Sequence, residues 1–146
     1  MKVKTAVQAF KTGTPTLVSM ELDAGRKTVI NYIKIWLISL NDYLNVTRKL
    51  QPAQINEIAH YIYSEYYYLQ IADIYLVFTD IKKGKYGQLY EGLDGIKLLS
   101  FFNQYAQERS ESIFYEGLND HAKTKEFELK RTNNAKRIHE LMFNKT

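Results

Sequence analysis

The stretch LQIADIYLVFTDIKKGKYGQLYEGLDGIKLLSFFNQYAQER, residues 69–109, predicts a helix, a short turn rich in glycine and tyrosine, and a second helix. Apolar side chains recur at helical spacing in its first part, at Ile71, Ile74, Tyr75 and Phe78. This spacing predicts an amphipathic helix over residues 71–83. The chain is therefore expected to be organised around two helices that a tight turn connects.

Local signals mark the ends of these two helices. Gly84 follows two lysines, which is typical of a helix end where glycine takes the left-handed conformation and cations lie near the negative end of the dipole. Residues 85–90 are too few and too rich in glycine to form a helix. Asp94 is a suitable N-cap, so a second helix is expected over residues 96–116.

Two further helices are predicted upstream. Residues 26–46 carry a broad apolar face, in which the single tryptophan, Trp36, is interpreted as a core anchor. Pro52 suits the first position of a helix over residues 52–65. His60 lies off the apolar stripe of that helix and is expected to be exposed, whereas the following side chains are expected to be buried: Ile55, Ile58, Ala59, Ile62 and Tyr66.

The sequence predicts an all-α single domain of about five helices with a projecting charged C-terminal helix. Residues 1–25 are expected to form an N-terminal arm with a short helix over 5–11 and an apolar segment, Leu17, Val18, Met20 and Leu22. Residues 26–116 form the expected core domain. Gly117 and Asn119-Asp120 predict a break before a basic tail, residues 117–146, which is expected to fray at residues 132–134.

The charges are distributed unevenly along the chain. The net charge is +4, with +5 in residues 1–50, −4 in residues 51–116 and +3 in residues 117–146. Basic ends around an acidic middle allow contact with DNA, but they are also ordinary for a helical protein with a solvated tail, which is the favoured interpretation. The candidate nucleic-acid contacts are cations of the turn and the tail: Lys82, Lys83, Lys85, Lys123, Lys125, Lys130, Arg131, Lys136 and Arg137.

No motif of a catalytic or metal site is recognised in the sequence. The chain has no cysteine, which excludes disulfides and thiolate chemistry, and its three histidines lack the spacing of metal ligands. Lys83-Gly84-Lys85-Tyr86-Gly87 lacks the pattern of a phosphate-binding loop, and it is interpreted as a glycine-capped turn in which Tyr86 and Tyr90 fold back onto the core. Anion binding through backbone N–H groups of the two glycines, beside the two lysines, is the alternative. We expect a cytoplasmic protein without enzymatic activity, cofactor or membrane contact.

A resemblance is carried by Ala72-Asp73-Ile74, the turn Lys83-Gly84-Lys85-Tyr86-Gly87 with Tyr90, Leu93-Asp94-Gly95, and Tyr105 with Glu108-Arg109. These residues resemble a motif in small proteins of Bacteroidota phages and mobile elements, crAss-like phages among them. The resemblance covers roughly residues 26–109. It marks the following residues as structural: Asp73, Gly84, Tyr86, Gly87, Tyr90, Asp94, Tyr105 and Arg109.

The resemblance also implies a function, because some phage relatives with a similar helical turn look like helicase-loader or replisome-organiser proteins. It implies a DNA replication accessory protein that contacts a protein partner through its helical body and DNA through its basic ends. The alternative is a structural or oligomerising phage protein of the virion or its assembly, which acts through helix packing.

Overall fold

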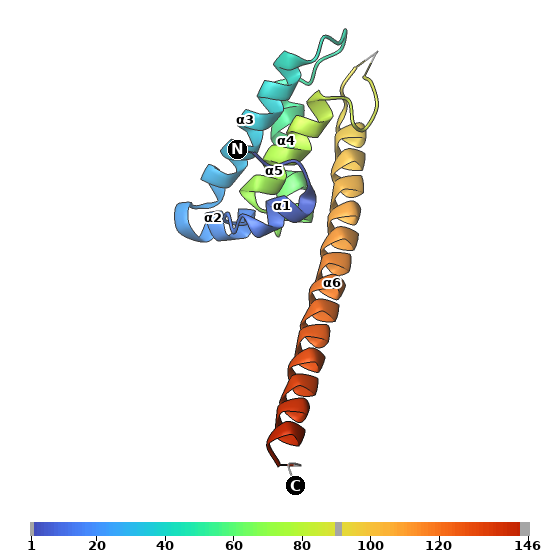
Figure 1. Cartoon of the computed structure of the whole chain (residues 1–146). Helices are drawn as coiled ribbons and strands as arrows, with labels where there is room; N and C mark the ends of the chain where they lie inside the picture. Colours follow the sequence, from blue (N-terminus) through green and yellow to red (C-terminus); the bar gives the residue numbers. More distant parts are fainter. Residues whose placement is uncertain (1, 90–91, 144–146) are drawn as a thin grey trace.

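The structure, a computed structural model, describes residues 2–89 and 92–143, and these contain six α-helices and no strand. This confirms the predicted all-α fold. Helices α1 to α5 gather into a body, and α6 runs along one side of it and continues far beyond (Figure 1). The helices are α1 (Ala6–Lys11), α2 (Leu17–Ala24), α3 (Arg26–Tyr43), α4 (Pro52–Tyr66), α5 (Ile71–Lys82) and α6 (Gly95–Phe143).

The N-terminal residues belong to the body, because Val3, Ala9 and Leu17 are buried in its core. The hydroxyl groups of two threonines start the short helices: Thr5 accepts from the Gln8 N–H at 3.2 Å, and Thr16 accepts from the Ser19 N–H at 3.1 Å. The expectation that Val18 and Leu22 also lie on the core is wrong. Their side chains are 37% and 84% exposed, because α2 presents only one narrow stripe to the body.

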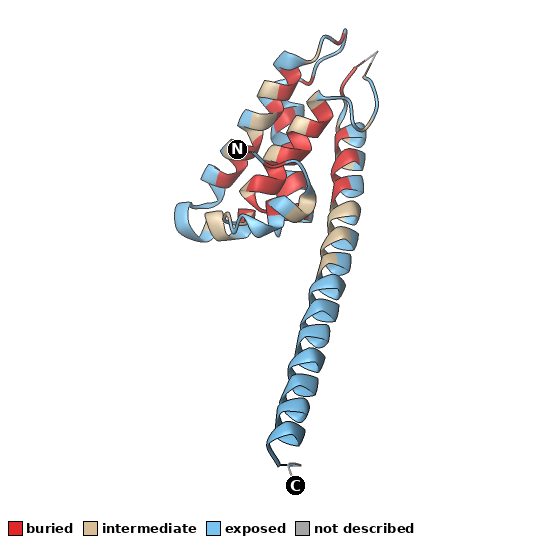
Figure 2. Ribbon diagram, in the orientation of Figure 1, coloured by how far each residue is buried: buried red, intermediate tan, exposed pale blue. Residues whose placement is uncertain are grey.

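Helix α5 lies at the centre of the body and is buried on nearly every side (Figure 2). The predicted helix is confirmed, since α5 begins at Ile71 and ends one residue before the expected end, but the expectation of one exposed polar face is wrong. It failed because α1, α3 and α6 all pack against α5, so that even its two aspartates are covered. The buried residues are Ala72, Asp73, Ile74, Leu76, Val77, Phe78, Asp80 and Ile81.

Helices α3 and α4 pack against each other, and α3 also packs against α5. The predicted stripe of α4 is confirmed, with His60 exposed. Helix α3 ends at Tyr43, three residues earlier than predicted, because Leu44 is extended (φ −75°, ψ 128°). Trp36 is half-buried and stacks on Phe78 with ring centroids 5.5 Å apart, as expected of a residue that anchors α3.

Helix α6 spans 49 residues without interruption. The predicted break at residues 117–120 and fraying at 132–134 are therefore wrong. The segment holds no proline, and its Lys, Glu, Arg and Leu residues favour a helix without any burial. Side chains near its start are buried, but every residue from 117 to 143 is exposed, and we call this part the stalk. None of the described helices combines the length and the apolar character needed to cross a membrane.

Candidate functional site

Asp73, in the first turn of α5, is the polar centre of the body. Its carboxylate is fully buried and accepts three hydrogen bonds: from the Gln70 N–H at 2.8 Å, the Tyr105 hydroxyl at 2.6 Å and the Arg109 Nε–H at 3.1 Å. The resemblance marked Asp73 as a structural residue without naming its partners. The structure adds two partners from α6, which lie on one face because they are four residues apart.

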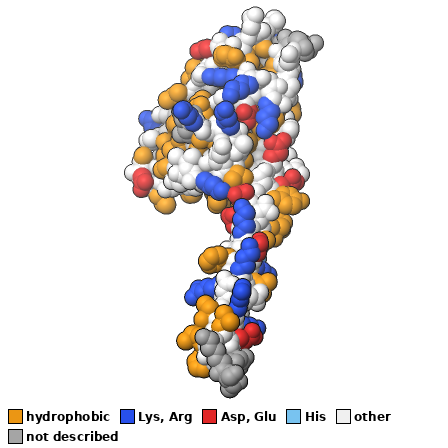
Figure 3. Space-filling model, in the orientation of Figure 1, with side chains coloured by type: hydrophobic (Ala, Val, Ile, Leu, Met, Phe, Trp, Pro, Cys, Tyr) orange, Lys and Arg blue, Asp and Glu red, His pale blue; other side chains and the backbone are white. Residues whose placement is uncertain are grey.

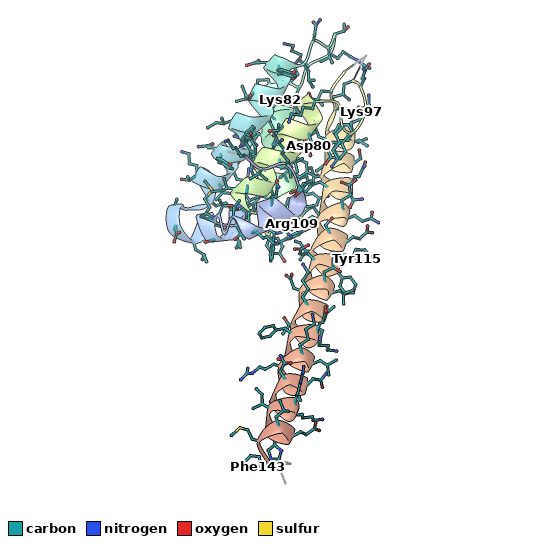
Figure 4. The ribbon with its side chains drawn as sticks, viewed as in Figure 1. Asp80, Lys82, Lys97, Arg109, Tyr115 and Phe143 are labelled. Atoms are coloured by element: carbon teal, nitrogen blue, oxygen red, sulfur yellow. The ribbon has the colours of Figure 1, made fainter. Side chains whose placement is uncertain are left out.

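Arg109 links this centre to the N-terminal residues. Its guanidinium lies 5.7 Å from the centroid of the Phe10 ring and 5.8 Å from that of Tyr68. The negative face of an aromatic ring attracts a guanidinium cation at such distances. Figure 4 shows Arg109 where α6 passes the lower edge of the body. The pair Asp73–Arg109 therefore joins α5 and α6, and its two flanking rings come from α1 and from the joint after α4.

The chemistry of this site favours a structural role. All three donors to Asp73 come from the chain itself, and the carboxylate has no exposed surface. Burial raises the pKa of Tyr105, and the neighbouring Asp73 carboxylate raises it further, so the hydroxyl remains protonated and continues to donate. A buried charge with complete hydrogen bonding fixes the position of α6 on α5.

The turn after α5 has the geometry that its glycines predict. Gly84 has φ +80°, and Gly87 has φ +106°. The Gly84 N–H donates to the Ile81 carbonyl at 3.1 Å, and the Lys85 N–H donates to the Asp80 carbonyl at 3.0 Å. These two bonds form a Schellman motif, which ends the helix with a left-handed residue. The prediction for Gly84 is confirmed.

Two more residues at or near the turn, Tyr86 and Asp94, take the positions that the sequence predicts. Tyr86 stacks on Phe101 of α6, with centroids 5.4 Å apart, so this ring folds back onto the core as predicted. Burial raises the pKa of Tyr86, and Asp80 and Glu108 add to that effect. Tyr90 lies outside the described residues. Asp94 accepts from the Lys97 N–H at 2.8 Å, which confirms it as the N-cap of α6.

The cations of the turn are largely engaged within the chain. Lys82 donates to the Ser39 hydroxyl at 2.9 Å and lies 5.8 Å from the centroid of Trp36. Lys85 lies 3.1 Å from a Glu108 oxygen and 3.7 Å from an Asp80 oxygen. Lys83 is exposed. The turn therefore offers less free positive charge than its sequence suggests.

The candidate cations of the tail lie on the stalk and are exposed: Lys123, Lys125, Lys130, Arg131, Lys136 and Arg137. Figure 4 shows Lys82 near the upper end of the body, whereas the stalk extends from its lower edge to Phe143. The structure therefore does not bring the two groups of candidate contacts together on one surface. In the described ranges, no group of three His, Asp or Glu side chains is arranged to hold a metal ion.

Sequence reasoning missed the part that Gln70 and Thr14 take in the buried centre. The Thr14 hydroxyl donates to the Gln70 side-chain oxygen at 3.2 Å and accepts from the Ala72 N–H at 3.2 Å, so the loop before α2 helps to cap α5. Thr14 is 56 positions from Gln70 and 58 positions from Ala72 along the chain. No local spacing signals a contact of that range.

Comparison with known proteins gives one match. No curated protein and no solved structure matches the chain. A protein-family model, described as a family of unknown function (DUF6633), matches residues 49–144, about two thirds of the sequence. The matched part holds Asp73, Tyr105, Arg109, the glycine turn and the stalk. The chain therefore belongs to the DUF6633 family of unknown function.

Proposed function

We propose that the protein is a non-enzymatic accessory protein whose stalk binds DNA. The observation that carries this proposal is a helix whose residues 117–143 are all exposed and carry six cations. A helical body of this size gains no core from such an extension, so the stalk is suited to contact another macromolecule. The setting that we propose, DNA replication in a phage or mobile element, rests on the motif resemblance described above.

Three of the six cations form a stripe along the stalk. Lys123, Lys130 and Arg137 are spaced by seven residues, so each lies about 10 Å further along the helix axis and only about 20° around it. Figure 3 shows Lys and Arg side chains following one another down the stalk. A row of cations along one face of a helix is suited to neutralise phosphates of a DNA backbone.

One residue of the stripe, Lys130, forms an ion pair within the stalk. Glu126 lies 3.1 Å from the Lys130 ammonium, one helical turn away. Both side chains are largely exposed, and exposed pairs of this kind contribute at most about 1 kcal/mol. A phosphate can therefore displace Glu126 from Lys130.

The proposal is tested by measuring DNA affinity over a range of salt concentrations. Three engaged phosphates give a slope of log affinity against log salt of roughly −3. Replacing the stripe, Lys123→Gln, Lys130→Gln and Arg137→Gln, should flatten that slope. The matched control is the triple variant Lys125→Gln, Arg131→Gln and Lys136→Gln, which removes the same charge from other faces of the stalk.

The control triple variant should keep most of the slope of the unaltered protein. Equal slopes for the two triple variants would contradict binding through the stripe. A full chain that does not bind DNA at low salt would reject the proposal altogether.

A second candidate function is oligomerisation through the stalk. The observation in its favour is a group of exposed apolar side chains near the end of the stalk: Phe127, Ile138, Leu141 and Met142. They are 57–67% exposed and recur at helical spacing. Light scattering across a range of concentrations tests this candidate. A stable oligomer that Leu141→Asp dissociates, together with no DNA affinity, would favour it over DNA binding.

A further inference from the structure

A polar cavity of about 420 Å³ lies where the loop between α3 and α4 meets the start of α6. Three cations from two segments line it: Arg48 and Lys49 from the loop, and Lys97 from the first turn of α6. Thr47, Gln51, Gln54 and Asp94 also line it. Figure 4 shows Lys97 at the upper end of α6, remote from the stalk.

The backbone that carries these cations is held at several points. The Leu93 N–H donates to the Arg48 carbonyl at 3.2 Å, which joins the two segments that form the cavity. Asn41, buried in α3, donates to the Leu50 carbonyl at 3.0 Å and accepts from the Leu50 N–H at 2.9 Å. The backbone of the loop therefore has little freedom to rearrange, and it holds Arg48 and Lys49 beside the cavity.

Gly92 sets the distance between the two segments. A Cβ atom at this position would lie 3.0 Å from the Arg48 Cβ and 3.2 Å from the Arg48 carbonyl oxygen. A side chain at position 92 would crowd Arg48, so glycine suits this close approach of the two segments. The close approach of the two backbones therefore places Arg48 and Gly92 together at the cavity.

The charges at the cavity favour an anion. Asp94 is the acidic residue among its described lining, and one of its oxygens already accepts the Lys97 N–H at 2.8 Å as the cap of α6. None of the ion pairs found in residues 2–89 and 92–143 involves Arg48, Lys49 or Lys97. Helices α4 and α6 both begin at the cavity, and the positive ends of their dipoles add to the field of the three cations.

We propose that this cavity binds the phosphate groups of a small phosphorylated ligand of nucleotide size. A guanidinium holds two phosphate oxygens at once, and the two ammonium groups supply mobile point charges beside it. The volume lies in the range of small-molecule sites and exceeds what one phosphate fills. The site is separate from the DNA stripe, because Lys97 and Lys123 are about 39 Å apart along a continuous helix.

The test uses the full chain and three probes: inorganic phosphate, pyrophosphate and ADP, titrated by calorimetry at fixed ionic strength. We expect pyrophosphate to bind more tightly than phosphate, because it engages more of the three cations. Tighter binding of ADP than of pyrophosphate would show that the cavity also holds the nucleoside. Equal binding would show that only the diphosphate is recognised, and both results support the site.

Variants locate the binding. Arg48→Gln and Lys97→Gln should each weaken pyrophosphate binding by about tenfold, since each removes a hydrogen bond between charged groups. The control is the double variant Lys125→Gln and Lys136→Gln, which removes two exposed cations from the stalk and should change the affinity less than about twofold. Equal weakening by the control would show a general charge effect and would overturn the proposal.

A second readout on the unaltered protein does not depend on the folding of variants. Amide resonances of Lys49, Leu93 and Lys97 should shift on addition of pyrophosphate, whereas those of Lys123 and Lys130 should not. Shifts confined to the stalk, or no binding of any of the three probes at millimolar concentration, would overturn the proposal.

Discussion

Tyr105 and Asp73, 32 residues apart in sequence, meet in a buried hydrogen bond of 2.6 Å that attaches α6 to the central helix α5. The bond matters because residues 117–143 form a stalk in which every residue is exposed. The direction in which the stalk leaves the body is therefore set by the few turns of α6 that pack on α1, α4 and α5. Among these contacts, the hydrogen bonds to Asp73 are the most directional.

Removing the Tyr105 hydroxyl should destabilise the fold. Tyr105→Phe keeps the ring in the core but leaves the buried Asp73 carboxylate with one donor fewer, which costs about 1–3 kcal/mol. Unfolding by urea measures the loss. Tyr115→Phe, on an exposed ring of the same helix, is the matched control and should stay within about 0.5 kcal/mol. Similar effects of the two changes would mean that the hydrogen bond is not important for stability.

The glycine of the Schellman motif should be a stability site because of its backbone angle alone. A Cβ at Gly84 would meet nothing within 4 Å, but φ is +80° there. Gly84→Val forces a branched side chain into the left-handed region, at a cost of about 1–2 kcal/mol or more. Thermal unfolding should show a lower midpoint.

The control for this change is another glycine with open surroundings. Gly117 lies inside α6, and a Cβ added there would also meet nothing within 4 Å, but its φ is not positive. Gly117→Ala should therefore stabilise the helix locally, by about 0.5–1 kcal/mol. A lower midpoint in both variants would point to a cause other than the left-handed conformation.

Asp80 should make stability depend on pH in an unusual direction. Burial raises the pKa of Asp80, and the nearby Lys85 and Lys83 only partly oppose that effect. A folded-state pKa above the unfolded value means that the folded protein binds the proton more tightly. The contribution of Asp80 to stability is therefore greatest at low pH and falls as pH rises through the folded-state pKa.

Asp80→Asn removes this ionisation. The variant should be more stable than the unaltered protein at pH 7, and the difference should shrink as pH falls below the folded-state pKa of Asp80. Urea unfolding at several pH values between 3 and 7 measures it (about the range over which such a carboxyl group titrates). A variant that is less stable at pH 7 would show that the attraction of Lys85 outweighs burial.

Much of the body could be predicted from sequence because its helices follow local rules. The stripe of α4, the cap at Asp94 and the glycine end of α5 depend on residues within one or two turns of each other. The full burial of α5 could not be predicted, because α1 and α6 also pack against this helix and its two aspartates, Asp73 and Asp80, are buried. A polar residue in a sequence predicts an exposed position unless its buried hydrogen-bond partners are also known.

In the candidate sites, too, single residues could be selected from the sequence, but contacts between distant segments could not. The motif residues Asp73, Tyr105 and Arg109 were selected from sequence, yet only the structure shows that they form one hydrogen-bonded group. Arg48 and Lys97 were not selected, because the contact of Leu93 with Arg48 brings together segments that are more than forty positions apart. The continuity of α6 was missed for another reason: Gly117 and Asn119 predict a break only when a different conformation competes with the helix.

The stalk should lose its amide protection gradually toward its C-terminal end. Its residues make no buried contacts, so its helix is stabilised only by propensity and by continuity with the packed turns that precede it. Amide exchange should be slow at Leu98, Phe102 and Tyr105, faster after residue 117 and fastest near Phe143.

Hydrogen exchange measured at low and at high protein concentration separates the two candidate functions. If the stalk is a free DNA-binding arm, exchange is independent of concentration, and added DNA slows it along the stripe of Lys123, Lys130 and Arg137. If the stalk associates with a second copy, exchange around Phe127, Ile138 and Leu141 slows as the concentration rises. Uniformly slow exchange along the stalk at low concentration and without DNA would contradict the expectation of a stalk that is stabilised only from its base.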